Sequence, residues 1–157
     1  MKINDIVHIL GDLCSTAILV LHGITGCDTV GRFSGKSKEF WFRRFMSFER
    51  QNQKLFRALV DFGNSTTENS LKEIEGFIYR GYLFPRSNAK IKQNEVYDIK
   101  TTRYKLFTQN KFEGSKLPPT KGALQKHLER AHYQILQWNF SYFAELPEKD
   151  PLDYGWI

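Results

Sequence analysis

The sequence predicts a mainly α-helical fold, an irregular helical bundle, and three observations support that prediction. Apolar residues recur at spacings of three and four along most of the chain, which is the period of a helix with one buried face. No stretch alternates between apolar and polar residues as a half-buried strand does. The chain has 157 residues, 41% of them apolar, which is enough material for the core of one domain.

The first 62 residues are expected to hold four helical segments around a glycine-rich turn. Residues 3–10 and 13–22 are the first two, with Asp12 as the cap of the second. The buried stripe of the second is predicted to be Leu13, Ala17, Val20 and Leu21. After the turn, two further helices with a break near Ser47 are predicted by Trp41, Phe45, Phe48, Leu55, Leu59 and Phe62.

Residues 63–157 are expected to be a helical extension within the same compact unit. Residues 63–70 form a loop that ends in a cap at Asn69 or Ser70, and residues 85–94 resemble a linker in composition. A helix is predicted over residues 95–108. Its inward side chains are expected to be Val96, Ile99, Tyr104 and Phe107.

The clearest element is a long amphipathic helix from about residue 120 to residue 144. Two prolines precede it, and Thr120 is a suitable N-cap. Its apolar stripe repeats every three or four residues and comprises Leu124, Leu128, Ala131, Ile135, Trp138 and Tyr142. The tail after Pro147 is expected to be extended, with Tyr154 and Trp156 docked on the bundle.

The composition also limits the surroundings of the protein. Its net charge of +6 favours anionic partners such as nucleic acid. No apolar run approaches the ~18 residues that a membrane-spanning helix needs. The two cysteines, Cys14 and Cys27, fit a reducing compartment. We therefore expect an intracellular protein, nuclear or cytoplasmic, without a membrane partner.

The stretch HGITGCDTVGRFSGKSK, residues 22–38, suggests several chemistries that its spacing excludes. A Walker loop has four residues between its glycines, whereas Gly31 and Gly35 have three between them. Zinc sites use closely spaced cysteine and histidine pairs, and the chain has no C-x-x-C or H-x-x-x-H unit. Cys27 and His22 are close in sequence only, and no G-x-S-x-G motif supports nucleophilic catalysis.

Asp28 and the basic residues after it remain as candidates. A carboxylate in glycine-rich backbone suits a hard cation such as Mg²⁺, and the alternative is a cap of a short helix. The sequence after Gly35 reads as a tight turn that enters a basic helix. Cations oppose the dipole at a helix N-terminus, so their presence favours a bound phosphate. The expected nucleic-acid contacts are Gly35, Lys36, Lys38, Arg43 and Arg44.

Two distant segments resemble one large group of animal proteins that look derived from mobile elements. TGCDTVGRFSGKSK resembles the TGCDTTSAFxGKGK segment of that group. KLPPTKGALQKHLERAHYQ resembles its LPPTxxALxxHxxRAxYQ stretch, PLDYGW resembles its closing PSPxxxGW, and RYKLF, residues 103–107, also fits. The resemblance covers nearly the whole chain and implies kinship without a defined activity.

The first of these segments also resembles the last metal-binding turn of flap-endonuclease-type PIN nucleases. In those enzymes a GCD or GSD sequence precedes a helix–two-turn–helix of the form GIGPK. The resemblance implies that Asp28 is an acidic metal ligand, that Gly35 is the first glycine of the hairpin, and that Lys36 and Lys38 face the DNA backbone. Ser37 stands in place of the second glycine.

Three functions remain open at this point. The first is a nucleic-acid-binding helical region derived from the C-terminal part of a PIN-type nuclease and inactive alone, with DNA favoured over RNA. The second is a Mg²⁺-dependent structure-specific nuclease completed by further sequence or a partner protein, since only Asp5 and Asp12 precede Asp28. The third is a helical protein-interaction module anchored by Trp138, Tyr142, Tyr154 and Trp156.

Overall fold

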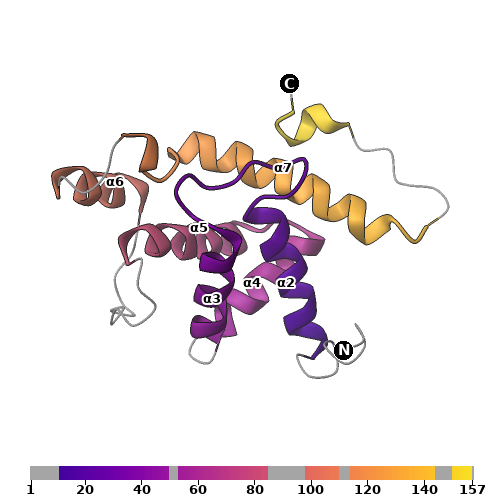
Figure 1. Ribbon diagram of the computed structural model, residues 1–157. Coiled ribbons are helices and arrows are strands. Elements are labelled where there is room, and N and C mark those ends of the chain that lie inside the picture. The colour runs from indigo at the N-terminus through magenta and orange to yellow at the C-terminus, as the bar shows by residue number, and fades with distance from the viewer. Residues whose placement is uncertain (1–10, 50–52, 85–97, 110–113, 144–149, 157) are drawn as a thin grey trace.

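The computed structural model describes residues 11–49, 53–84, 98–109, 114–143 and 150–156 (Figure 1). These residues contain six α-helices and no strand, so the prediction of a mainly α fold is confirmed. The helices are α2 (Asp12–Ile24), α3 (Lys38–Glu49), α4 (Gln53–Asn64), α5 (Glu68–Leu83), α6 (Ile99–Thr108) and α7 (Lys121–Phe140), with two short 3-10 turns, η1 (Gly114–Lys116) and η2 (Pro151–Tyr154). None of the described helices has the length and apolar character needed to cross a membrane.

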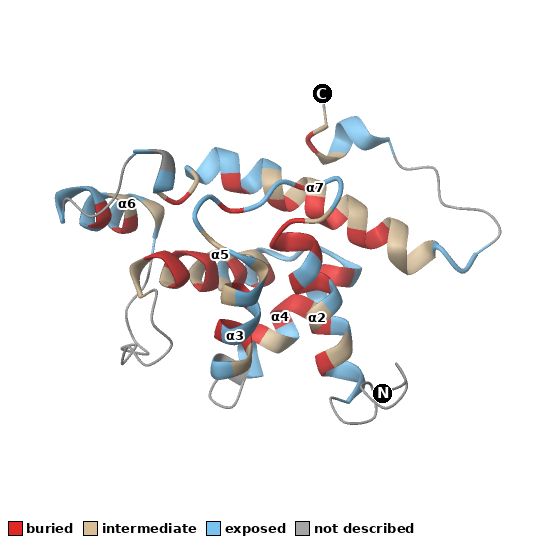
Figure 2. Cartoon of the chain, in the orientation of Figure 1, coloured by how far each residue is buried: buried red, intermediate tan, exposed pale blue. Residues whose placement is uncertain are grey.

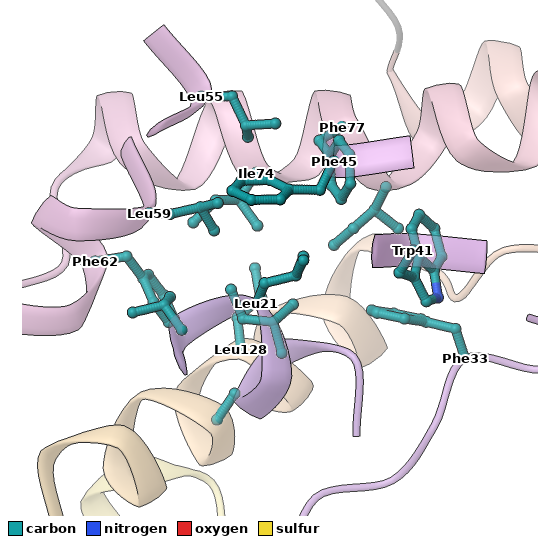
Figure 3. Close-up of a cluster of buried hydrophobic side chains, with 14 of the residues drawn as sticks. Leu21, Phe33, Trp41, Phe45, Leu55, Leu59, Phe62, Ile74, Phe77 and Leu128 are labelled. Atoms are coloured by element: carbon teal, nitrogen blue, oxygen red, sulfur yellow. The ribbon is translucent and has the colours of Figure 1, made fainter. Parts of the chain in front are cut away.

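The helix α4 packs against both α2 and α5, and α7 packs against α2 and α4. The core lies between these four helices. Buried positions face inward along all four helices (Figure 2). Aromatic side chains fill much of this interior (Figure 3), and the largest fully buried ones are Trp41, Phe45, Phe62, Phe77, Tyr79 and Tyr82. Aromatic rings of this size dominate the energetics of a core, so α3 is held mainly by Trp41 and Phe45.

Glycines allow three of the helix contacts to be close. A Cβ atom at Gly81 would lie 2.6 Å from Cη2 of Trp41, which is inside van der Waals contact. A Cβ atom at Gly63 of α4 would lie 2.9 Å from Cγ2 of Val20 in α2. One at Gly23 of α2 would lie 2.9 Å from Cγ1 of Ile135 in α7. A side chain at any of these positions would therefore push two elements of the bundle apart.

Helix starts follow the local chemistry of their caps. The Thr120 hydroxyl accepts a hydrogen bond from the Ala123 amide at 3.3 Å, which confirms the predicted cap of α7. The cap of α5 is Thr67, two or three residues before the predicted Asn69 or Ser70. Thr67 and Ser70 form a reciprocal capping box. Asp12 is the first residue of α2 rather than its cap, which is Gly11 with φ 77°.

Other predicted boundaries are shifted by a few residues. Ser47 lies inside α3, so the break between α3 and α4 comes after Glu49. The long helix α7 ends at Phe140, and Tyr142 lies beyond it with 94% of its surface exposed. The predictions for residues 3–10, 85–97 and the side chain of Phe48 fall outside the described part of the chain.

In α2 and α6, some of the residues that were predicted to be buried are exposed, and their neighbours are buried instead. In α2, Leu13 is 66% exposed and Cys14 is buried in its place, whereas Ala17, Val20 and Leu21 are buried as predicted. In α6, Tyr104 and Phe107 are each 69% exposed, and Thr102 and Leu106 are buried instead. The predicted α6 set includes a spacing of five between Ile99 and Tyr104, and residues five apart do not share one helix face.

The described part of the tail contains a 3-10 turn rather than only extended chain. The Asp150 carboxylate accepts a hydrogen bond from the Leu152 amide at 2.9 Å at the start of η2. The ring of Tyr154 lies 5.3 Å from that of Tyr133 and 6.0 Å from that of His132, both on α7. Docking of Tyr154 on the bundle is therefore confirmed.

Gly81→Ala is expected to lower the free energy of unfolding by about 1–3 kcal/mol, because the new methyl group overlaps the Trp41 ring. Gly122→Ala is the matched control, since a Cβ atom there meets nothing within 4 Å outside its own helix. That variant should be neutral or more stable by up to about 1 kcal/mol. Urea denaturation of both variants measures the difference, and equal stabilities would contradict this packing.

Candidate nucleic-acid interface

A bend at residues 28–30 and a turn at residues 34–35 connect α2 to α3, where a helix–two-turn–helix-like turn was expected near residues 28–45. In the first, the Cys27 amide donates to the Val30 carbonyl at 3.0 Å. In the second, the Lys36 amide donates to the Phe33 carbonyl at 3.2 Å, and Gly35 has φ 69°. This backbone angle favours glycine. We call residues 31–38 the basic turn.

The basic turn is fastened to the bundle on both sides. Phe33 is buried, and its ring lies 5.4 Å from Trp41 of α3 and 4.6 Å from His127 of α7. The Tyr82 hydroxyl of α5 donates a hydrogen bond to the Ser34 carbonyl at 3.2 Å. Just before the turn, Thr29 donates to the Gln134 side chain of α7 at 2.6 Å. These contacts fix the backbone from which the basic side chains project.

Lys36 is partly exposed and lies over two aromatic rings. Its ammonium nitrogen is 4.6 Å from the ring centre of Phe40 and 5.2 Å from that of Tyr82. Burial lowers the pKa of Lys36, and the nearby Arg44 guanidinium lowers it further. Lys36 is therefore a positioned cation that keeps part of its surface exposed.

Lys38 is bound to the end of α2. Its ammonium lies 2.6 Å from Nδ1 of His22 and donates to the His22 carbonyl at 3.5 Å. Burial lowers the pKa of His22 and the Lys38 charge lowers it further, while Asp28 opposes both. The pKa of Lys38 is lowered mainly by burial; Cys27 and Asp28 oppose the shift and Arg32 adds to it. Lys38 thus lies among charged groups of both signs and remains partly exposed.

Arg44 is a structural residue in this arrangement, with 2% of its surface exposed. Its guanidinium donates to the Phe84 carbonyl at 2.5 Å and to the Arg80 carbonyl at 3.1 Å, at the C-terminal end of α5. Burial, with Arg80 nearby, lowers the pKa of Arg44 to about 10. Arg44 lies beneath the surface, so we do not include it among the residues that reach a phosphate.

Arg43, unlike Arg44, is largely exposed. It forms an ion pair with Glu39 one helical turn earlier, with 2.6 Å between Nη2 and Oε1. Exposed pairs of this kind contribute only about 0.3–0.5 kcal/mol. A phosphate can therefore compete for Arg43 at little energetic cost.

The described surroundings of Asp28 do not fit a Mg²⁺ centre. Asp28 is exposed, and the groups whose pKa it influences include His22 and Lys38, a nitrogen ligand and a cation. Mg²⁺ prefers oxygen ligands, and the described residues contain no cluster of three or more His, Cys, Asp or Glu that could hold a metal ion. Asp12 begins α2 and Asp28 follows its end, so the 13-residue helix separates them. Asp5 lies outside the described residues.

Arg32 belongs to this surface although the sequence reasoning missed it. It is exposed and lies close over Gly26, where a Cβ atom would be 2.5 Å from its Cγ. Gly26 has φ 109°, a backbone angle that favours glycine. The available signal was the position of Arg32 within the glycine-rich stretch, directly after Gly31.

The four aromatic residues of the interaction-module hypothesis have different surroundings. The ring of Trp138 lies 5.7 Å from His22, and Tyr154 packs on α7 as described above. Trp156 is partly buried. Tyr142 is largely exposed and is the member of this set that a partner could reach fully.

Comparisons of the chain with protein-family models, with curated proteins and with solved structures found no match. The kinship with PIN nucleases and with mobile-element proteins therefore stays a prediction. The candidate interface rests on this chain's own geometry. We define the basic surface as Arg32, Gly35, Lys36, Lys38 and Arg43.

Arg44→Ala is expected to lower the free energy of unfolding by about 2 kcal/mol or more, because two carbonyls lose a charged hydrogen-bond donor. Arg43→Ala is the control one residue away, and it should change stability by less than about 0.5 kcal/mol. Chemical denaturation checks both values. A stable Arg44→Ala variant with weakened nucleic-acid binding would return Arg44 to the interface.

Proposed function

We propose that this protein is a nucleic-acid-binding helical protein that contacts the phosphate backbone through the basic surface. The supporting observation is that Arg32, Lys36, Lys38 and Arg43, all at least partly exposed, lie in or just after one turn, although Asp28 and Glu39 are close to two of them. Burial lowers the pKa of Lys36, and Arg44 lowers it further. Burial also lowers the pKa of Lys38, where Arg32 adds to the shift while Cys27 and Asp28 oppose it. Neighbouring like charges disfavour the charged state of each group, and a bound anion relieves that cost.

A polyanion suits this surface better than a single small anion. Its cations come from two consecutive elements, the basic turn and the exposed side of α3. The planar guanidinium groups of Arg32 and Arg43 match two phosphate oxygens each, whereas Lys36 and Lys38 act as point charges. Contacts of this kind carry no base information, so binding should be independent of sequence.

The proposal is for binding without cleavage by the described region, with DNA favoured over RNA. The absence of a carboxylate cluster among the described residues supports binding rather than Mg²⁺-dependent chemistry. We also propose an intracellular location, nuclear or cytoplasmic. Cys14 and Cys27 are not joined in a disulfide, as is usual for proteins of reducing compartments.

The test is fluorescence anisotropy of labelled 20-base-pair DNA and RNA duplexes with the full chain between 50 and 200 mM salt. Affinity should fall steeply with salt, because bound phosphates release counterions. Arg32→Ala/Arg43→Ala removes two exposed cations and should reduce the slope of log K against log salt by about 1–2 units. DNA should bind at least as tightly as RNA.

Arg57→Ala/Lys72→Ala is the matched control, since it removes two exposed positive charges from α4 and α5, outside the basic surface. It should leave the salt slope close to that of the unaltered protein. The proposal would be overturned if the protein did not bind at 50 mM salt or if its affinity did not change with salt concentration. It would also be overturned if the two double variants reduced the affinity and the salt slope equally.

A further inference from the structure

The outward side of α6 carries two large aromatic side chains that the core does not use. Tyr104 and Phe107 are each 69% exposed, and Lys100 is also exposed. These residues follow one another at spacings of four and three, so they form one stripe along the helix. Thr102 and Leu106, on the opposite side, are buried. We call Lys100, Tyr104 and Phe107 the α6 face; α6 lies at one end of the bundle (Figure 1).

The surroundings of the α6 face are positively charged. In residues 98–109 and 114–121 the basic residues are Lys100, Arg103, Lys105, Lys116 and Lys121. The acidic residue of these two ranges is Asp98, whose carboxylate accepts hydrogen bonds from the amide and hydroxyl of Thr101, each at 2.9 Å. Asp98 is therefore engaged as the cap of α6. Arg103 donates to the Pro118 carbonyl, which holds the start of α7 beside α6.

We infer that the α6 face binds single-stranded nucleic acid, with bases stacked on Tyr104 and Phe107 and phosphates beside Lys100 and Lys105. Exposed aromatic rings between cations are the chemistry that single strands need, because unpaired bases offer free ring faces next to a negative backbone. The inference deepens the proposed function and rests on it. A protein partner fits less well, since the cores of protein interfaces are depleted of charged residues such as lysine.

The helix α6 and the basic turn both contact the C-terminal half of α5. Burial raises the pKa of Tyr79 in α5, Glu75 raises it further, and Asp98 at the start of α6 makes the smallest contribution. The helices α5 and α6 are therefore in contact there. One turn later, Tyr82 of α5 binds the Ser34 carbonyl of the basic turn.

The test measures binding of labelled oligothymidine and of a 20-base-pair DNA duplex to the full chain at a fixed low salt concentration. Tyr104→Ala/Phe107→Ala should weaken oligothymidine binding at least about tenfold, since the variant lacks both aromatic rings on which bases would stack. It should change duplex binding less than about twofold, because bases in a duplex stack on each other. Tyr104→Phe/Phe107→Tyr keeps both rings and should keep the affinity of the unaltered protein.

Tyr142→Ala/Phe143→Ala is the matched control, since it also removes one exposed tyrosine and one exposed phenylalanine, from a stretch without basic residues. It should leave both affinities unchanged. Thermal unfolding verifies that all variants remain folded, as substitutions at exposed positions should permit.

The outcomes separate the two proposals. If the unaltered chain binds neither oligothymidine nor duplex, both proposals fail. If it binds oligothymidine and Tyr104→Ala/Phe107→Ala binds equally well, or loses both ligands equally, the inference about α6 alone is overturned. Sedimentation velocity adds one further outcome: self-association that disappears in this variant, with oligothymidine binding retained, would assign the α6 face to a second copy of the chain and overturn the inference.

Discussion

The arrangement of the helices depends on side chains that bind backbone carbonyls at helix C-termini. The last carbonyls of a helix have no partner within it, and burying them unpaired is costly. His127 donates to the Ile24 carbonyl of α2 at 2.7 Å, and burial lowers its pKa although this hydrogen bond opposes the shift. His132 and Asn139 bind carbonyls near the end of α4 at 2.8 and 2.9 Å. Arg44 serves the end of α5 in the same way. Two helices, α7 and α3, thus hold the ends of three others.

The same constraint shapes the candidate interface. Because Arg44 turns inward to bind α5, its positive charge lies near Lys36 and adds to the lowering of the Lys36 pKa that burial causes. Because α7 and α5 hold the backbone around the basic turn, through Gln134 and Tyr82, the cations are placed before any ligand arrives. A surface that is ordered in advance loses less conformational entropy on binding. The features that stabilise the bundle therefore also favour an anionic partner.

The sequence predicted best what depends on local pattern. The mainly α fold and the cap of α7 follow from helical spacing and from Thr120, and so does its buried stripe from Leu124 to Ile135, whereas the predicted end of that stripe at Tyr142 is exposed. The burial of Arg44 was not predictable, because its carbonyl partners lie about 40 residues away and a lysine- and arginine-rich helix start reads as surface. The phase of α6 was wrong because aromatic residues were taken as core residues, whereas Tyr104 and Phe107 face outward. Of the candidate site, the position of the basic turn was predicted, and the distribution of its side chains between surface and interior was not.

The most direct test of the account is an NMR titration of the isotopically labelled full chain with oligothymidine and with duplex DNA. The account predicts amide shifts around Gly35, Lys36 and Lys38 with both ligands, and additional shifts around Tyr104 and Phe107 with oligothymidine only. Shifts confined to other helices, or no shifts at low salt, would contradict it.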